Sequence, residues 1–301
     1  MNVEDKLKEL LTLNNSINTK ILEILTYVIN NNENNKIEML SLSPDFDVLQ
    51  AINSNLWPPA VDEHLIVKSN NLDELKERAK GIIEFFIDQP LNDKKFLDYG
   101  CGNGLVVNES TLTSKYSIGY DIKNSDYWND INCTTDWNKI IENGPYDIVL
   151  AFDVLDHLIN ENPVDVLKKI RKVMTKNGVL YVRFHPFTSR TAIHSYKKLN
   201  KAYLHLVLNE EQLNQLLPNE DDYIPNYGPT RPIKTYDEYI KEAGFIIEDR
   251  QEERFFPEEF FKSPNISKLI QSKTGFNEYP EFQLSLEFLD YKLINNGKDI
   301  N

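Results

Sequence analysis

Three glycines stand at alternate positions directly after an apolar run that ends in a carboxylate. The run ends at Asp98, and the glycines are Gly100, Gly102 and Gly104. Glycine permits a tight turn with accessible peptide amides, and the amides at the start of a helix attract polar and anionic ligand groups. The pattern therefore predicts a buried strand, a sharp turn and a helix, with these four residues beside a bound ligand.

A second carboxylate follows at a distance that fits the same site. Asp121 lies near the end of the alternating, aromatic-rich segment 116–122, whose last residue is Ile122. An acidic residue at the end of the second strand can accept both hydroxyls of a ribose. The alternative is a solvated aspartate at a strand end, but the glycines upstream favour the ribose role.

A third segment has the composition of a central parallel strand. Residues 146–152 are almost continuously apolar, as expected of a strand covered on both faces, and the sequence Val-Leu-Asp-His follows. Phe152 and Asp153 then fall at the carboxyl edge of the sheet, where open α/β sheets bind ligands.

In this order and spacing, the motifs resemble those of class I S-adenosylmethionine (SAM) dependent methyltransferases, over residues from about 75 to 290. The resemblance implies SAM as methyl donor and S-adenosylhomocysteine as product. It also implies that Asp136 receives the adenine amino group and that Trp137 lines the ring, although an aspartate there is equally a good helix N-cap. The predicted cofactor residues are Asp98, Gly100, Gly102, Gly104, Asp121, Ile122, Asp136, Trp137, Phe152 and Asp153.

A nicotinamide cofactor is the alternative ligand for such a turn. The dinucleotide fingerprint is G-x-G-x-x-G, whereas the third glycine here comes one residue early and Leu105 follows it. SAM carries no phosphate and needs a less tight approach to the helix. The spacing therefore disfavours an NAD(P)-dependent oxidoreductase.

The remaining chain alternates between strand and helix patterns. Apolar spacing predicts a helix over 163–175 that Asn177 and Gly178 end, and a helix over 236–243 that Gly244 ends. Further strands are predicted at 179–184, 245–248 and 282–289. This alternation predicts an α/β fold with a doubly wound, seven-stranded, mostly parallel sheet of the Rossmann-like, class I methyltransferase kind and an N-terminal helical extension.

Methyl transfer mainly requires a positioned nucleophile, and a base only where the acceptor must lose a proton. Histidine titrates near neutral pH and suits that task. The candidates are His185 directly after the fifth strand, His157 in the turn after the fourth, and His194 in the long connection that follows. His157 can equally be structural. Arg183 or Arg190 could hold an acceptor carboxylate or phosphate, or either could be a surface charge.

Composition limits the partners. The net charge is −14, which disfavours nucleic acid because phosphate binding needs an excess of Lys and Arg. There is no run long enough to span a membrane, no signal-peptide pattern, no His/Cys cluster with zinc spacing and thus no expected metal. Two cysteines give no disulfide framework, so we expect a protein of the reducing cytoplasm.

The segments flanking the core are organised as follows. Residues 1–35 are predicted to form a helix whose apolar residues recur in steps of three and four, with polar Asn14 in the stripe. This favours either a homo-oligomer through residues 3–29 as a coiled coil, or packing on the chain's own domain. Residues 36–74 are a linker and lid segment that includes Trp57, followed by the SAM-binding domain at 75–293 with insertions at 185–235 and 254–280, and by a tail at 294–301.

Two functions follow from these patterns. The first is a SAM-dependent methyltransferase acting on a small-molecule or protein acceptor, which the long insertion 185–235 is placed to recognise. The second is a non-catalytic binding or assembly protein that keeps the SAM fold and oligomerises through its N-terminal helix. The sequence does not identify the acceptor atom.

Overall fold

The computed structural model describes residues 49, 52, 57, 59–62, 71–158, 161–192, 198–216, 233–255 and 284–297. The chain divides into two compact units, one made of residues 59–255 and 282–301 and the other of residues 1–58 and 256–281. The first unit carries the sheet. The predicted N-terminal helix, its oligomer surface at 3–29 and most of the insertion 254–280 lie outside the described residues.

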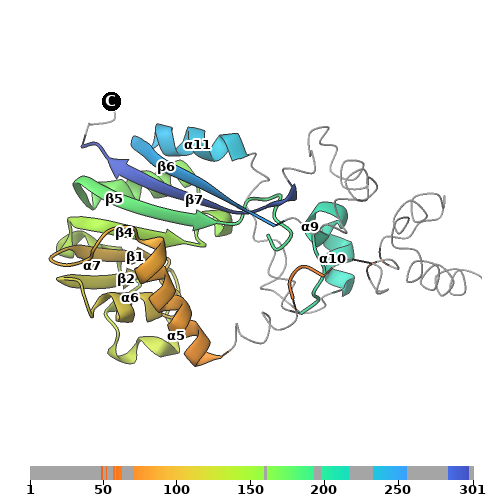
Figure 1. The fold of residues 1–301 in the computed structure, drawn as a ribbon, viewed down its shortest axis with the longest axis horizontal. Coiled ribbons are helices and arrows are strands. Elements are labelled where there is room, and N and C mark those ends of the chain that lie inside the picture. The colour runs from red at the N-terminus through yellow and green to blue at the C-terminus, as the bar shows by residue number, and fades with distance from the viewer. Residues whose placement is uncertain are drawn as a thin grey trace, which may run out of the picture. The chain divides into compact units, whose positions relative to one another are not determined.

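A seven-stranded sheet with the order β3-β2-β1-β4-β5-β7-β6 forms the centre of the first unit (Figure 1). Its first five strands pair in parallel, while β7 is antiparallel to both β5 and β6. The predicted fold class is therefore confirmed. The strands are β1 Lys95–Tyr99, β2 Tyr116–Tyr120, β3 Cys133–Thr134, β4 Tyr146–Phe152, β5 Met174–Phe184, β6 Phe245–Arg254 and β7 Leu286–Asn295.

Several of the helices begin at a side chain that accepts a backbone N–H. Asn71 accepts from Asp73 N at 2.9 Å, and Asn162 accepts from Val164 N at 3.0 Å directly before Pro163 at the first helical position. The helices are α5 Leu72–Gly81, the π-helix η2 Ile82–Phe86, α6 Leu105–Ser110, η3 Asp126–Asp130, α7 Trp137–Asn143, η4 Leu155–His157, α8 Pro163–Lys172, α9 Leu204–Val207, α10 Glu210–Leu216 and α11 Ile233–Glu242.

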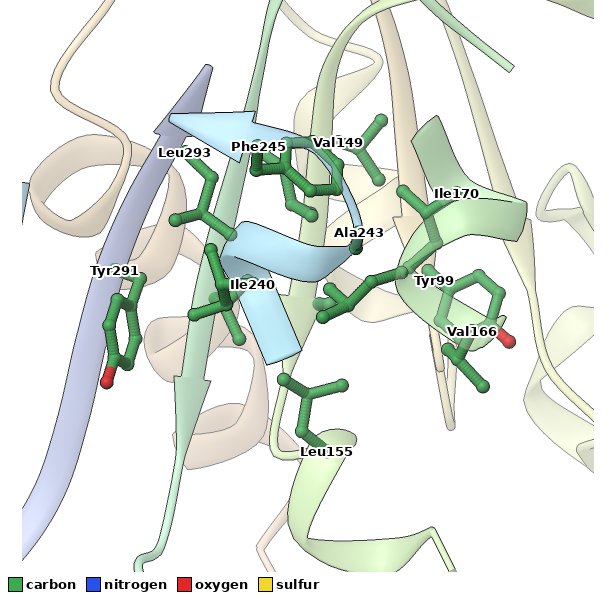
Figure 2. Close-up of a cluster of buried hydrophobic side chains, with 14 of the residues drawn as sticks. Tyr99, Val149, Leu155, Val166, Ile170, Ile240, Ala243, Phe245, Tyr291 and Leu293 are labelled. Atoms are coloured by element: carbon green, nitrogen blue, oxygen red, sulfur yellow. The ribbon is translucent and has the colours of Figure 1, made fainter. Parts of the chain in front are cut away.

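The two faces of the sheet are covered by different helices. On one face, strand residues such as Val149 and Leu293 pack with Val166 and Ile170 of α8 and with Ile240 of α11 (Figure 2). On the other face, alternate strand residues pack with the segment after α5; this second cluster comprises Ile82, Ile87, Leu91, Phe96, Ile148, Leu150, Val179 and Tyr181. Period-two alternation thus sends neighbouring residues into separate cores, as a doubly wound sheet requires.

Several predicted boundaries are wrong: α11 begins at Ile233 and not at 236, β6 continues to Arg254 and not to 248, and β5 begins at Met174 and not at 179. Helix α8 ends at Lys172, and Asn177 and Gly178 lie inside β5, whose register with β4 shifts between Tyr146 and Ile148. Asn177 has φ 64°, a left-handed conformation that asparagine tolerates, so this turn pair marks an irregularity in a strand and not the end of a helix.

The last strand is a further boundary error. β7 spans Leu286–Asn295 and not 282–289, so the predicted tail at 294–301 begins within the strand. Buried and half-buried side chains alternate along β7, which shows that Tyr291 and Leu293 belong to the core. Within the described ranges, no helix has both the length and the apolar character to cross a bilayer.

Core packing of β1 predicts a large stability difference between two leucines. Leu97 is 0% exposed, whereas Leu112 is 74% exposed. We expect Leu97→Ala to lower the free energy of unfolding by about 2–5 kcal/mol through lost burial and a cavity, and Leu112→Ala by less than about 0.5 kcal/mol. Urea unfolding followed by circular dichroism measures both, and equal losses would contradict the placement of β1 in the core.

Candidate functional site

The glycine turn between β1 and α6 has the left-handed backbone conformations that glycine permits. Gly100, Gly102 and Gly104 have φ of 82°, 51° and 78°, and the peptide N–H groups of Gly100 and Cys101 both donate to Tyr120 O, at 2.7 and 3.1 Å. A Cβ on Gly100 would lie 2.4 Å from Val154 Cγ2, whereas one on Gly102 would meet no atom within 4 Å. The turn is therefore packed against the segment after β4 at one end and open at position 102.

Asp121 at the end of β2 lies directly beside this turn. Its Oδ2 accepts from Gly102 N at 2.9 Å, and its Oδ1 accepts from Lys123 N at 3.2 Å. The Gly102 amide, which we expect to be accessible to a ligand, thus already has an acceptor within the chain, and hydrogen bonds to an ionised carboxylate are strong. The bond brings the two principal predicted residues together, and both remain in an exposed setting.

The short helix η3 adds a residue that the motifs did not identify. Trp128 Nε1–H donates to Gly102 O at 2.8 Å, and a Cβ on Gly104 would lie 3.3 Å from Trp128 Cδ1. Beside it, Tyr127 is 53% exposed and Ile122 is 73% exposed. Exposed apolar groups next to a polar turn are the surface that an aromatic ligand ring needs. Only the aromatic pair at 127–128, close behind Asp121, could have indicated this.

Asp136 and Trp137 have structural partners. Asp136 Oδ1 accepts from Asn138 N at 2.9 Å and caps α7. The Trp137 ring packs edge-on against Tyr99 and Tyr120, with centroids 5.8 and 4.9 Å away. The N-cap alternative is therefore confirmed for Asp136, and the adenine role of both residues stays a prediction.

Asp98 is buried within β1. Burial, with the charge of Asp121 as the second cause, raises the pKa of Asp98 to about 7. It pairs in register with Gly119 of β2 and with Leu150 of β4, so the carboxyl ends of the three strands meet beside it. Asp98 is only 3% exposed, so it is not part of the exposed surface of the turn.

The residues after β4 form an ion pair with α5. Asp153 has φ 55°, and its Oδ2 accepts from Arg78 Nη2 at 3.0 Å, while its Oδ1 is buried without a hydrogen-bond partner among the described residues. Burial raises the pKa of Asp153, and Arg78 is the largest opposing influence. The centroid of the Phe152 ring is 5.2 Å from the guanidinium group of Arg78 and 5.5 Å from that of Arg183. Arg78 belongs to no motif, so the sequence did not indicate it.

The predicted bases differ in their surroundings. His185 is buried, its Nδ1 lies 3.2 Å from Glu287 O, and burial lowers its pKa to about 3. A histidine with such a pKa is a weak base at neutral pH, so burial disfavours the predicted role of His185. His157 is half-buried in η4, and its charge lowers the pKa of Asp153. His194 lies outside the described residues.

The two arginines proposed for acceptor recognition pair within the chain. Arg183 makes a bidentate pair with Asp290, at 2.7 and 2.6 Å, and Arg190 Nε lies 3.2 Å from Glu287 Oε2. Both carboxylates belong to β7. The charges of these guanidinium groups are thus already compensated by the sheet.

Two free thiols lie close together at the glycine turn and the neighbouring strand. Cys101 follows β1 and Cys133 lies on β3, and a Cβ on Gly119 of the intervening strand would be 2.7 Å from each sulfur. The side-chain contact with Cys133 and burial raise the pKa of Cys101. Across the described residues, no group of three or more His, Cys, Asp or Glu side chains is placed to hold a metal ion.

Residues 72–221 match a family profile described as a methyltransferase domain. The match begins at α5 and includes the glycine turn, Asp121 and the segment after β4. Residues 72–221 are therefore similar to the methyltransferase-domain family, in agreement with the resemblance of the motifs. No curated protein sequence matches this chain.

Solved structures give only a distant likeness. A SAM-dependent methyltransferase from Archaeoglobus fulgidus has 16% identity and a TM-score of 0.44 over 77% of this chain and 100% of its own. The cyclopropane synthase MmaA2 from Mycobacterium tuberculosis has 15% identity and a TM-score of 0.44 over 85% and 95%. Magnesium protoporphyrin IX methyltransferase from Synechocystis, solved with bound S-adenosylhomocysteine (SAH), has 14% identity and a TM-score of 0.40 over 74% and 87%. At these scores none of them informs the acceptor.

The turn geometry predicts different costs at two of its glycines. We expect Gly100→Ala to lower the free energy of unfolding by about 3 kcal/mol, from left-handed backbone strain and overlap with Val154. Gly102→Ala meets no neighbour and should cost only the strain, about 1–2 kcal/mol. Urea unfolding of both variants tests this, and a greater loss for Gly102→Ala would contradict the packing of Val154 on the turn.

Proposed function

We propose that the open side of the glycine turn, Asp121 and the edge after β4 form the SAM site of a methyltransferase that acts on a small-molecule or protein acceptor. The observation that carries this proposal is the hydrogen bond from Gly102 N to Asp121 Oδ2, at 2.9 Å. It joins the ends of β1 and β2 in one exposed place, where one ligand can reach both groups.

The nucleoside half of the cofactor is assigned to the β2 side of the turn. A ribose can exchange its hydroxyls for the Gly102 amide as the partners of Asp121, because a carboxylate accepts from two donors. The exposed side chain of Ile122 and the neighbouring Tyr127 offer apolar surface to an adenine, and Asp136 at the start of α7 remains exposed enough to receive its amino group.

The methionine half is assigned to the Arg78–Asp153 pair. Val154 packs on Gly100, so Asp153 lies next to the turn, with one carboxylate oxygen buried and unpartnered among the described residues. An amino acid is a zwitterion. Its carboxylate can replace Asp153 at Arg78 by a bidentate bond, and its ammonium can pair with Asp153. The Arg78–Asp153 ion pair thus supplies one positive and one negative group, which complement the carboxylate and the ammonium of the methionine tail.

The chain's contribution to the reaction is positional. When bound, SAM supplies the electrophilic methyl group, and the displacement requires the acceptor in line with it. The carboxyl edge after β4, beside the methionine half of the cofactor, is the place where an acceptor can lie in line with the methyl group. His157 is half-buried, and its charge lowers the pKa of Asp153. Among the described histidines, it is therefore our candidate for the base that takes a proton from the acceptor.

Loss of cofactor binding tests the site directly. Gly102→Arg directs a long side chain into the open space above the turn, and Asp121→Ala removes the ribose acceptor. We expect each to weaken SAH binding by roughly tenfold or more, Asp121→Ala because a charge-assisted hydrogen bond is lost and Gly102→Arg because its side chain occupies the space of the ligand. Isothermal titration measures this, with Asp165→Ala, exposed on α8, as the control. Unchanged affinity in both variants would refute the site.

The role of Arg78 is tested by comparing two ligands. SAH carries the amino-acid tail, whereas methylthioadenosine is a nucleoside without it. We expect Arg78→Gln to weaken SAH binding by about tenfold, the worth of a bidentate charged pair, and to leave methylthioadenosine unchanged. Lys76→Gln, on the exposed surface of the same helix, is the matched control. Equal weakening of both ligands would contradict the assignment of the methionine tail.

Turnover is a separate question from binding. SAH release should be followed during incubation of the protein with SAM and with pools of small molecules or proteins as acceptors. Release that depends on Asp121 supports methyl transfer. Tight SAH binding without release from any pool would favour the non-catalytic assembly protein.

A further inference from the structure

Three aromatic rings surround one ammonium group beneath the proposed cofactor site. Lys169 of α8 places its Nζ 4.2 Å from the centroid of the Trp137 ring, 4.8 Å from that of Tyr120 and 5.8 Å from that of Tyr99. The same Nζ lies 3.4 Å from the Tyr120 hydroxyl oxygen. All three distances are within the range in which a cation is attracted to the negative face of an aromatic ring.

The rings are also in contact with one another. Trp137 meets Tyr99 and Tyr120 edge-on, at interplanar angles of 81° and 76°, and the two tyrosine rings lie 5.3 Å apart. Tyr99 and Tyr120 are buried in the core cluster, and Trp137 packs against it. The ammonium therefore completes a packed group and does not bind to a single ring at the surface.

Each ring belongs to a different element of the cofactor site. Tyr99 is the last residue of β1 and precedes Gly100, and Tyr120 is the last residue of β2 and precedes Asp121. Trp137 is the first residue of α7 and follows Asp136. The three elements that carry the turn, the ribose carboxylate and the predicted adenine acceptor thus meet at one cation.

We propose that Lys169 is a positioning residue, which holds the ends of β1 and β2 and the start of α7 together and thereby sets the affinity for the nucleoside half of the cofactor. This inference rests on the proposed SAM site. Lys169 acts through the three rings and not by contact with the ligand. Partial burial lowers the pKa of Lys169, and the charge of Glu161 opposes that shift.

The test uses three variants of the full chain. Lys169→Met removes the charge and keeps an unbranched apolar side chain, and Lys169→Arg keeps a cation that stacks on aromatic rings. Lys172→Met makes the same change at an exposed position of the same helix. Isothermal titration with SAH and with methylthioadenosine gives the affinities, and thermal unfolding gives the stability.

We expect Lys169→Met to weaken both ligands by the same factor, roughly three- to tenfold, which corresponds to one or two lost cation–π contacts. Lys169→Arg should stay within about twofold of the wild type, which the retained cation–π attraction would allow. Lys172→Met should bind both ligands like the wild type. Equal loss of both ligands distinguishes this effect from that of Arg78, which concerns SAH alone.

Two results would overturn the inference. One is a Lys169→Met protein that melts at a lower temperature and yet binds both ligands as the wild type does, because this would make the lysine merely structural. The other is Lys169→Arg binding as weakly as Lys169→Met. If Lys169→Met does not fold, Lys169→Gln replaces it under the same criteria. A wild-type protein that binds neither ligand would instead contradict the proposed SAM site.

Discussion

The parallel pairing of β1 with both of its neighbours is the constraint on which the site depends. Asp98 lies in register with Gly119 on one side and with Leu150 on the other, so the three strands end at the same edge of the sheet. Because of this register, Gly102, Asp121 and Asp153 approach one another although the chain separates them widely. A slip of one residue in β1 would exchange the side chains that face the two cores and would move the glycine turn out of line with Asp121.

The charges of the site are compensated within the protein. Asp121 is paired with a backbone amide, Asp153 with Arg78, and Arg183 with Asp290. Such pairs keep partly buried charges from being left alone, which is costly in a medium of low polarity. They also mean that a ligand binds here by exchanging partners. Affinity then depends on how well the ligand reproduces these contacts, and less on how many it adds.

The fold and the cofactor edge were largely predictable because they depend on local pattern. Residue type alone predicts a left-handed turn at Gly100, Gly102 and Gly104, and the apolar run at 146–152 predicts a buried strand. Contacts between segments that are distant in the sequence cannot be recognised from a local sequence pattern. Nothing in the composition around Arg78 relates it to Asp153, and Lys169 has the spacing of an ordinary helix residue.

The errors have a similar cause. Asn177 and Gly178 are residue types that favour turns. Only the pairing of β5 with β4 shows that the chain here belongs to a strand. His185 follows a strand end as a catalytic residue would, but its burial depends on β7, which lies about a hundred residues further along. Residue type thus predicted the local backbone conformation, whereas tertiary contacts determined the secondary structure around Asn177 and the burial of His185.

Gly119 has a consequence for the evolution of this chain. Two sulfur atoms, from Cys101 and Cys133, fill the space where its side chain would be. The volume over this point of β2 is therefore shared by three positions that are far apart in the sequence. In related chains a larger residue at 119 should be accompanied by a smaller one at 101 or 133, so these positions should vary together even though none of them carries the chemistry.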